Sequence, residues 1–321
     1  WIYTITDSKK CIKMNALKRP SNTIVFPERL NHKTVALLYA KIEAVCARST
    51  VNKTIFFDAS TLKFIDAFSM TALFNEIADI KSKNWKTYIC GHIDAAGNLK
   101  EPVRFMDDCE FFLLMSGKRL SLHSECRDSS LPIKRLLPRE TVAWLRFTAM
   151  PWLARLLNTN TNALVEIQVC LEELFNNTRD HSGIEFSSIF IQYYPRCGEI
   201  KICLSDNGIG LVEKIRKSHP DLLPEKAVDY ALQEGFTTKS SPRNAGMGLF
   251  TLTSVICNNG GQFALRTGNV YSLVTADGNG AHRINHLTNE PFFKGTAFEI
   301  TLFASELDLQ QGDREEFSWD W

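Results

Sequence analysis

The chain has 321 residues, a length that predicts two domains, and its 44% hydrophobic and 23% charged residues are the balance of an ordinary globular protein. The 37 Lys and Arg residues nearly equal the 36 Asp and Glu residues, which leaves a formal net charge of +1. This balance excludes a chain-wide field that would attract nucleic acid or an anionic membrane.

The nine cysteines are odd in number and none belongs to a Cys-x-x-Cys pair, which argues against a disulfide framework and against a zinc site. Free thiols favour a reducing, cytoplasmic location. No segment approaches the roughly 20 apolar residues that a membrane span needs. The first residues predict a strand and not a signal peptide, and the start on Trp1, without a Met, leaves open whether an upstream segment is missing.

The first third of the chain alternates short apolar strand patterns with amphipathic helical patterns. The predicted strands are Thr23–Phe26, Thr54–Phe57 and Thr87–Cys90, and the predicted helices are His32–Ala47 and Phe68–Ile80. This alternation predicts a βαβ domain over residues 1–120. The periodicity then fades, so we place a linker at residues 121–133.

A helix-rich stretch from Lys134 to Leu157 opens the second predicted domain, which covers residues 134–306. Later in this domain, Gln262–Arg266 and Val270–Thr275 predict a hairpin. The acidic, aromatic tail at residues 307–321 is expected to be disordered or to dock a partner.

A long helical pattern runs from Leu164 to His181 within the second domain. Glu173, Asn177 and His181 are spaced four residues apart and form a polar row beside the apolar stripe. On this helix alone, a solvated face explains the row as well as a functional site does.

Two predicted strands follow, Ser187–Tyr194 and Glu199–Ser205, and the second leads directly into Asp206-Asn-Gly-Ile-Gly210. A carboxylate at a strand end can accept a hydrogen bond from an adenine amino group, and the two glycines let the backbone pass close to the base. Turns of this composition also occur at ordinary hairpins.

A segment rich in Gly, Ser, Thr and Lys extends from Glu234 to Leu249 and precedes an apolar helix at Phe250–Cys257. Free N–H groups and the positive dipole end at a helix N-terminus favour phosphate binding. The alternative is that Gly246 and Gly248 only permit close helix packing.

Taken in order, these blocks resemble the ATP-binding domain of the GHKL superfamily, which includes gyrase, the heat-shock chaperone ATPase, histidine kinases and MutL. The matching segments are Glu173–His181 for the N box, Asp206–Gly210 for the first glycine box, Phe236–Lys239 with Gly246–Leu249 for the ATP lid and second glycine box, and Gly295–Phe298 for the final Gly-Thr strand. The resemblance covers roughly residues 130–306 and implies a Bergerat-type α/β sandwich that binds ATP and Mg²⁺.

The resemblance implies a role for each matching residue. Glu173 would be the general base, Asn177 would bind Mg²⁺, and Asp206 with Gly208 and Gly210 would bind adenine. Lys239 and Arg243 would neutralise phosphate charge, the N–H groups of Gly246, Met247, Gly248 and Leu249 would hold the phosphates, and Thr296 would support the adenine end. His181 caps or packs the helix end in the favoured interpretation. Asn244 departs from the family pattern, which often has Gly there.

The first domain resembles the STAS fold of anti-sigma-factor antagonists, on the basis of Thr54–Asp58 and Leu62–Leu73. That family carries a phosphorylatable Ser directly after the Asp that corresponds to Asp66. This chain has Ala67 at that position, with Ser69 two residues later as an offset acceptor. A generic βαβ module is the alternative interpretation.

The function that these resemblances favour is an ATP-driven regulatory switch, in which ATP and Mg²⁺ order the lid and the changed surface acts on a protein partner through the STAS-like domain or on a second copy of the chain. The alternative is a serine/threonine kinase of the anti-sigma-factor type with a STAS protein as substrate. A histidine kinase is disfavoured because no His lies in a His-Glu-x-x-x-Pro-like helix. A binding-only scaffold is disfavoured because Glu173, Asn177 and Asp206 are all present.

Overall fold

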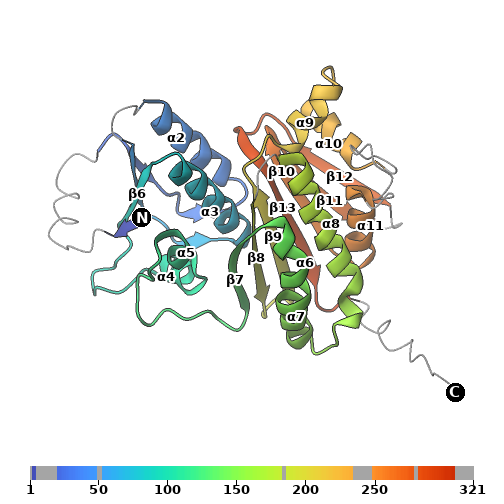
Figure 1. Ribbon diagram of the computed structural model, residues 1–321, viewed down its shortest axis with the longest axis horizontal. Helices are drawn as coiled ribbons and strands as arrows, with labels where there is room; N and C mark the ends of the chain where they lie inside the picture. Colours follow the sequence, from blue (N-terminus) through green and yellow to red (C-terminus); the bar gives the residue numbers. More distant parts are fainter. Residues whose placement is uncertain are drawn as a thin grey trace.

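The computed structural model describes residues 2–4, 20–48, 53–182, 186–233, 248–277 and 281–307, with the backbone alone described at 2–4 and 177–182. The chain is a mixed α/β protein with 41% helix and 28% strand, in agreement with the predicted class. Figure 1 shows its main elements grouped around two sheets, with helices between the sheets and on their outer sides.

The first sheet is parallel, with the strand order β1-β6-β4-β2. Its strands are β1 (Ile2–Thr4), β2 (Thr23–Val25), β4 (Thr54–Asp58) and β6 (Lys86–Cys90), and β3 (Arg29–Leu30) pairs separately with β5 (Phe64–Ile65). The accompanying helices are α2 (Val35–Arg48), α3 (Ala67–Ser82), α4 (Glu101–Asp108) and α5 (Phe111–Ser116). We refer to the elements from β1 to α5 as the N-terminal unit.

The second sheet is antiparallel and has seven strands in the order β12-β11-β10-β13-β9-β8-β7. Its strands are β7 (Ser130–Leu136), β8 (Ser187–Tyr194), β9 (Glu199–Asp206), β10 (Gln262–Gly268), β11 (Val270–Ala276), β12 (His282–Leu287) and β13 (Phe293–Phe303). Its helices are α6 (Pro138–Trp144), a π-helical turn η1 (Leu145–Ala149), α7 (Met150–Leu157), a 3₁₀ turn η2 (Asn162–Leu164), α8 (Val165–Ser182), α9 (Leu211–Ser218), α10 (Pro224–Ala231) and α11 (Leu249–Asn258). We refer to the elements from β7 to β13 as the C-terminal unit.

Helix α3 lies between the two sheets (Figure 1). It contacts β6 of the parallel sheet and also β8, β9 and β13 of the antiparallel sheet. Its sequence is small or apolar around most of its circumference, which is the composition of a helix buried on several sides. Asp66 caps its first turn by accepting the N–H of Ser69 at 2.8 Å. The helix is therefore shared by the cores of the two units.

Strand β9 is covered on both faces, which explains its uninterrupted apolar run at Ile202–Leu204. Ile202 and Leu204 belong to the core that the C-terminal unit's own helices cover, whereas Cys203 belongs to the core shared with the N-terminal unit. By this alternation, Asp206 lies on the same face as Leu204.

Most of the expected elements are confirmed by the structure, among them the three strands and two helices of the first third and the hairpin of β10 and β11. The helix-rich stretch predicted from Lys134 is wrong at its start, because Ser130–Leu136 forms β7 and pairs with β8. The helix begins at Pro138 instead, where proline occupies the first turn and leaves no helical hydrogen bond unmade. Among the helices that the structure describes, none has the length and apolar character to cross a membrane.

Candidate functional site

A row of polar side chains crosses three neighbouring strands of the antiparallel sheet. Asp206 at the end of β9 lies opposite Thr296 in β13, and Thr296 lies opposite Thr267 in β10. Residues directly opposite each other on antiparallel strands project from the same face. The row therefore lies on the face of Leu204, which the helices of the C-terminal unit cover.

The Asp206 carboxylate is buried, with 3% of the residue exposed. It accepts the N–H of Gly208 at 2.7 Å and a second backbone N–H from Thr296. Burial outweighs these two bonds and raises the pKa of the carboxyl to about 7. Asp206 is thus a carboxyl group that changes charge near neutral pH and is held in a fixed position.

Two glycines allow the strand ends to come together around Asp206. Gly295 has φ of +78°, and a Cβ there would overlap the carbonyl oxygen of Asp206. Gly210 has φ of +84°, and a Cβ there would lie 2.9 Å from Thr267 Oγ1 and 3.0 Å from the Gly295 oxygen. Only glycine suits this combination of positive φ and close approach. Gly210 is the second glycine of the Asp206–Gly210 motif, which identified this loop as a candidate site in the sequence.

The hydroxyl groups of the row differ in their hydrogen bonds. Thr296 Oγ1 accepts the N–H of Leu211 at 3.1 Å and so anchors the first turn of α9. Thr267 is fully buried, and its Oγ1 has no hydrogen-bond partner among the described residues. A buried hydroxyl without a partner beside a glycine-lined strand end is the kind of group that a bound ligand satisfies.

Helices α8 and α11 cover the same face as this row. Leu171 and Leu174 of α8 and Leu249 of α11 belong to the core that contains Leu204, and α11 packs on α8 and on β10. Glu173 lies in α8 next to these core residues and is half-buried. Gly248 caps α11 at its N-terminus.

The structure thus brings together the sequence-predicted residues Asp206, Gly208, Gly210 and Thr296, and it places Glu173, Gly248 and Leu249 in the helical layer over the same face. Other predicted residues lie outside the described part of the chain: Lys239, Arg243, Gly246, Met247 and the side chains of Asn177 and His181. Asn244 lies there as well. The roles of these residues stay predictions.

The loop that follows Asp206 is hydrogen-bonded to α3 on the opposite face of the sheet. Asn207 Nδ2 donates to the carbonyl oxygen of Asn75 at 3.0 Å and is 3.4 Å from Glu76 Oε2. The Asn75 side chain in turn donates to the carbonyl oxygen of Ser205 and accepts from Ser188 Oγ. We call these five residues the α3 clasp. It connects the N-terminal unit directly to the strand end that carries Asp206.

Sequence reasoning missed Thr267, Asn75, Glu76 and Asn207. Thr267 falls just after the first predicted strand of the hairpin, Gln262–Arg266, whereas in the structure it is still paired in β10 and is the last paired residue before a register shift. For the clasp, the available signal was the polar Asn75-Glu76 pair, which has apolar residues on both sides in the middle of the helix. Buried polar groups require partners, so such a pair indicates a polar contact from another element.

Ser69, the offset phosphoacceptor suggested by the sequence, is completely buried in α3. A kinase needs access to the hydroxyl of its substrate, and this arrangement of the two units gives none. Phosphorylation of Ser69 would require α3 to separate from its surroundings.

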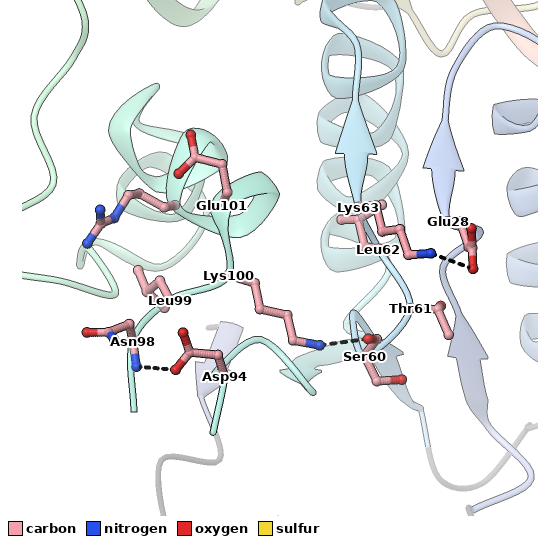
Figure 2. A pocket seen from close by; sticks show the side chains of 11 residues that line it. Glu28, Ser60, Thr61, Leu62, Lys63, Asp94, Asn98, Leu99, Lys100 and Glu101 are labelled. Atoms are coloured by element: carbon pink, nitrogen blue, oxygen red, sulfur yellow. Dashed lines mark hydrogen bonds and ion pairs between the residues drawn. The ribbon is translucent and has the colours of Figure 1, made fainter. Parts of the chain in front are cut away.

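A separate cavity of about 900 Å³ lies in the N-terminal unit, beyond the ends of β4 and β6 (Figure 2). Lys100 Nζ donates to the carbonyl oxygen of Ser60 at 2.6 Å, and Lys63 forms an ion pair with Glu28 at 3.0 Å. Cations and carboxylates both line this cavity, so it presents no charge of one sign to a ligand.

No protein-family model matches the chain, and no curated protein matches its sequence. The support for a function therefore comes from the geometry of the site and from the motifs.

The α3 clasp predicts a specific dependence of stability on pH. Burial raises the pKa of Glu76 to about 7 from the ordinary value of 4.5, against the opposing effect of Lys294. Between these two pH values the folded state binds more protons at Glu76 than the unfolded state, so the free energy of unfolding falls as the pH rises through this window. We expect Glu76→Gln to remove this fall and to be more stable than the wild type at pH 8, by about 2 kcal/mol.

Urea unfolding at pH 5, 6.5 and 8 measures this effect. Glu213→Gln, on an exposed position of α9, is the matched control and should retain the wild-type slope. Parallel pH slopes for Glu76→Gln and the wild type would show that Glu76 does not titrate in the interface.

Proposed function

We propose that this chain is an ATP-binding, Mg²⁺-dependent ATPase of the GHKL type that acts as a nucleotide-driven switch on a protein partner. The observation that carries the proposal is Asp206, a buried carboxylate held by two backbone N–H groups at a glycine-lined strand end. The proposal adds that the C-terminal unit is a Bergerat-type sandwich and that the N-terminal unit is STAS-like.

The row on β9, β13 and β10 has the hydrogen-bonding groups that an adenine ring needs. Asp206 accepts a hydrogen bond from the exocyclic amino group, and the unpartnered hydroxyl of Thr267 is available to a ring nitrogen or to a bridging water. Gly210 and Gly295 let the backbone of the neighbouring strand ends approach closely, which holds Asp206 beside Thr296 in this row.

The triphosphate lies toward the N-terminus of α11, at Gly248 and Leu249. The first N–H groups of a helix have no partner within the helix, and its dipole favours negative charge there. Lys239 and Arg243 add positive charge to the same segment in this proposal.

Glu173 acts as the general base that orients and deprotonates the attacking water. The donor set fits a magnesium site of the family type, because Asn177 lies one helical turn after Glu173 and offers an amide oxygen to a hard cation. Bound Mg²⁺ supplies neutralisation of the phosphate charge.

The α3 clasp gives the switch its connection to the N-terminal unit. Asp206 and Asn207 are consecutive, but their side chains have partners on opposite faces of the sheet. Asp206 bonds within its own loop, and Asn207 bonds to α3. A nucleotide that repositions the Asp206 loop changes the hydrogen bonds to Asn75 and Glu76, and a partner that binds the N-terminal unit biases the same loop. The partner is a protein that docks on the N-terminal unit or a second copy of the chain.

Nucleotide binding is tested by calorimetry with a non-hydrolysable ATP analogue. We expect affinity to rise with pH up to about 7 and then to level off, because the carboxylate of Asp206 accepts the adenine hydrogen bond only when ionised. Below that pH, the affinity for the analogue falls by up to about tenfold for each pH unit. Asp206→Asn should bind more weakly with little pH dependence, and Asp206→Ala should lose binding.

Asp94→Asn, in the separate cavity of the N-terminal unit, is the control and should bind like the wild type. The absence of any binding heat at high micromolar analogue would remove the proposal. Equal binding by Asp206→Ala and the wild type would remove the role of Asp206.

The catalytic role of Glu173 predicts a separation of binding from turnover. Glu173→Gln should hydrolyse ATP about 100-fold or more slowly and bind the analogue with nearly unchanged affinity. Glu172→Gln, the neighbouring residue on the same helix, should retain activity within a few-fold. Release of inorganic phosphate from labelled ATP measures turnover, and label transferred to an added STAS protein would favour the kinase alternative. Full activity of Glu173→Gln would contradict the assignment.

The clasp predicts that a residue of the N-terminal unit controls nucleotide affinity. Asn75→Ala removes the hydrogen bonds to Ser205 and Ser188 and should weaken analogue binding by about fivefold or more, the range of ordinary coupling between sites. Asn22→Ala is the matched control, because Asn22 donates a similar side-chain hydrogen bond to the Thr54 carbonyl away from the clasp. If both variants lose stability and neither loses affinity, the clasp has a structural role alone.

A further inference from the structure

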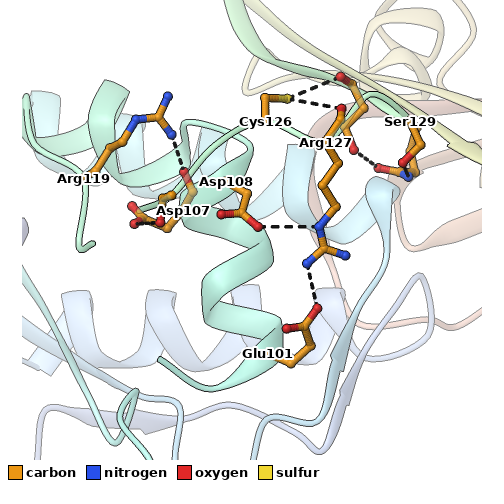
Figure 3. A network of polar contacts seen from close by, with 10 residues as sticks. Glu101, Asp107, Asp108, Arg119, Cys126, Arg127 and Ser129 are labelled. Carbon is orange, nitrogen blue, oxygen red and sulfur yellow. Dashed lines mark hydrogen bonds and ion pairs between the residues drawn. The ribbon is translucent and has the colours of Figure 1, made fainter. Parts of the chain in front are cut away.

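A pair of thiols lies where the N-terminal unit joins the segment that leads to β7. Cys109 follows α4 and is fully buried, and Cys126 is half-buried on the joining segment. Both cysteines lie against the start of β7, where the Ile133 N–H donates to the carbonyl oxygen of Cys109 at 3.2 Å. Cys126 Sγ also lies 3.3 Å from the carbonyl oxygen of Ser130, the first residue of β7 (Figure 3). The pair thus consists of one buried thiol, Cys109, and one thiol that solvent can reach, Cys126.

The chain on both sides of Cys126 is fastened to α4, which holds Cys126 near the end of the helix where Cys109 lies. On one side, Asp107 is fully buried, and its carboxylate accepts the N–H groups of Leu120 and Ser121 at 2.9 Å and the hydroxyl of Ser124. On the other side, Arg127 forms ion pairs with two carboxylates of α4 and stacks on the ring of Phe105 at 5.3 Å, as Figure 3 shows for the ion pairs. A disulfide requires its two Cα atoms within about 7 Å, and this double anchoring favours such an approach.

We propose that Cys109 and Cys126 form a redox-active dithiol that a peroxide oxidises to an intramolecular disulfide. This inference is independent of nucleotide binding. Cys126 is the attacking residue, because it is the accessible one, and Cys109 is the resolving residue. Such transient disulfides are the form in which a reducing compartment uses paired thiols for sensing.

The electrostatic surroundings agree with these roles. The interaction with Cys109, followed by the opposing effect of burial and the favourable charge of Arg119, lowers the pKa of Cys126 from its ordinary value. The same interaction together with burial raises the pKa of Cys109. The thiolate is the nucleophilic form of cysteine, so the first attack comes from Cys126.

The reaction balances in two steps. The Cys126 thiolate attacks one peroxide oxygen, the O–O bond breaks, and a sulfenic acid forms while the leaving oxygen takes a proton to give water or an alcohol. The Cys109 sulfur then attacks the sulfenic sulfur, the S–S bond forms, and hydroxide leaves with the Cys109 proton as water. The peroxide is reduced by two electrons, and the two thiols are oxidised by the same two.

The disulfide would join the end of α4 to the segment directly before β7. That segment is already tied to the antiparallel sheet, because the Tyr193 N–H donates to the Ser129 oxygen at 2.8 Å and Ser130 Oγ bonds to Gln192. Oxidation would therefore replace a non-covalent connection between the two units with a covalent one.

The test treats the full-length chain with hydrogen peroxide, alkylates the remaining thiols, and maps the peptides without reduction. We expect a Cys109–Cys126 disulfide that dithiothreitol reverses, and alkylation of Cys126 by iodoacetamide about tenfold faster than that of exposed Cys197. Cys109→Ser should accumulate a sulfenic acid at Cys126 that dimedone traps. Cys126→Ser should leave Cys109 reduced.

Cys197→Ser is the matched control, and the pair should still form its disulfide in this variant. Wild-type protein that is oxidised at Cys197 as fast as at Cys126 and yields no Cys109–Cys126 peptide overturns the proposal. Because that outcome is read on the wild type, it does not depend on whether either serine variant folds. Circular dichroism of the variants identifies any that fail to fold.

Discussion

Helix α3 is packed between a parallel and an antiparallel sheet, and the arrangement of both units depends on this packing. Its buried side chains share one core with Phe190, Cys203, Phe293 and Ala297 of the C-terminal unit. A helix in this position has no solvent-exposed face along most of its length, so its polar residues must find partners in the sheets. Asn75 and Glu76 find them at the end of β9. The packing that joins the units thus also determines where the strand end with Asp206 lies.

Burial between the sheets and in the strand end also raises the pKa values of three carboxyl groups toward neutral pH. Burial raises the pKa of Asp66 to about 6 and those of Glu76 and Asp206 to about 7. Ionisation of each carboxyl group lowers the free energy of unfolding of the protein, unless a hydrogen-bond donor or a cation stabilises the carboxylate. Donors from the protein meet part of this need at all three groups: the Ser69 N–H at Asp66, the Asn207 amide at Glu76, and the N–H groups of Gly208 and Thr296 at Asp206. In the proposed function a ligand adds a further donor to Asp206, and a ligand that does so stabilises the folded protein.

The local pattern of the sequence predicted most elements and the placement of Asp206, because strand alternation and glycine spacing are properties of short segments. Gly210 and Thr296 were selected by motif, and the register explains both, since Thr296 lies opposite Asp206. The clasp was not predictable in this way. Asn75 and Asn207 are 132 residues apart in sequence, and a contact at that separation depends on how the two units pack. The strand β7 was missed because it crosses a stretch with weak periodicity and gains its partner only from β8.

In the proposed function, the nucleotide site and a partner on the N-terminal unit would be coupled through the end of β9, without a long pathway. Asp206 and Asn207 are joined by one peptide bond. The Asp206 side chain accepts a hydrogen bond within its own loop, whereas the Asn207 side chain donates one to α3. Coupling between distant sites requires an element with two arrangements that both ligands bias. This loop meets the geometric part of that requirement, because Gly208 and Gly210 give it conformational freedom while Asn75 and Thr296 fix its two sides. A shift of the loop that strengthens its contacts on one side of the sheet weakens its hydrogen bonds on the other side. The proposed switch therefore needs only this loop to couple the two sites.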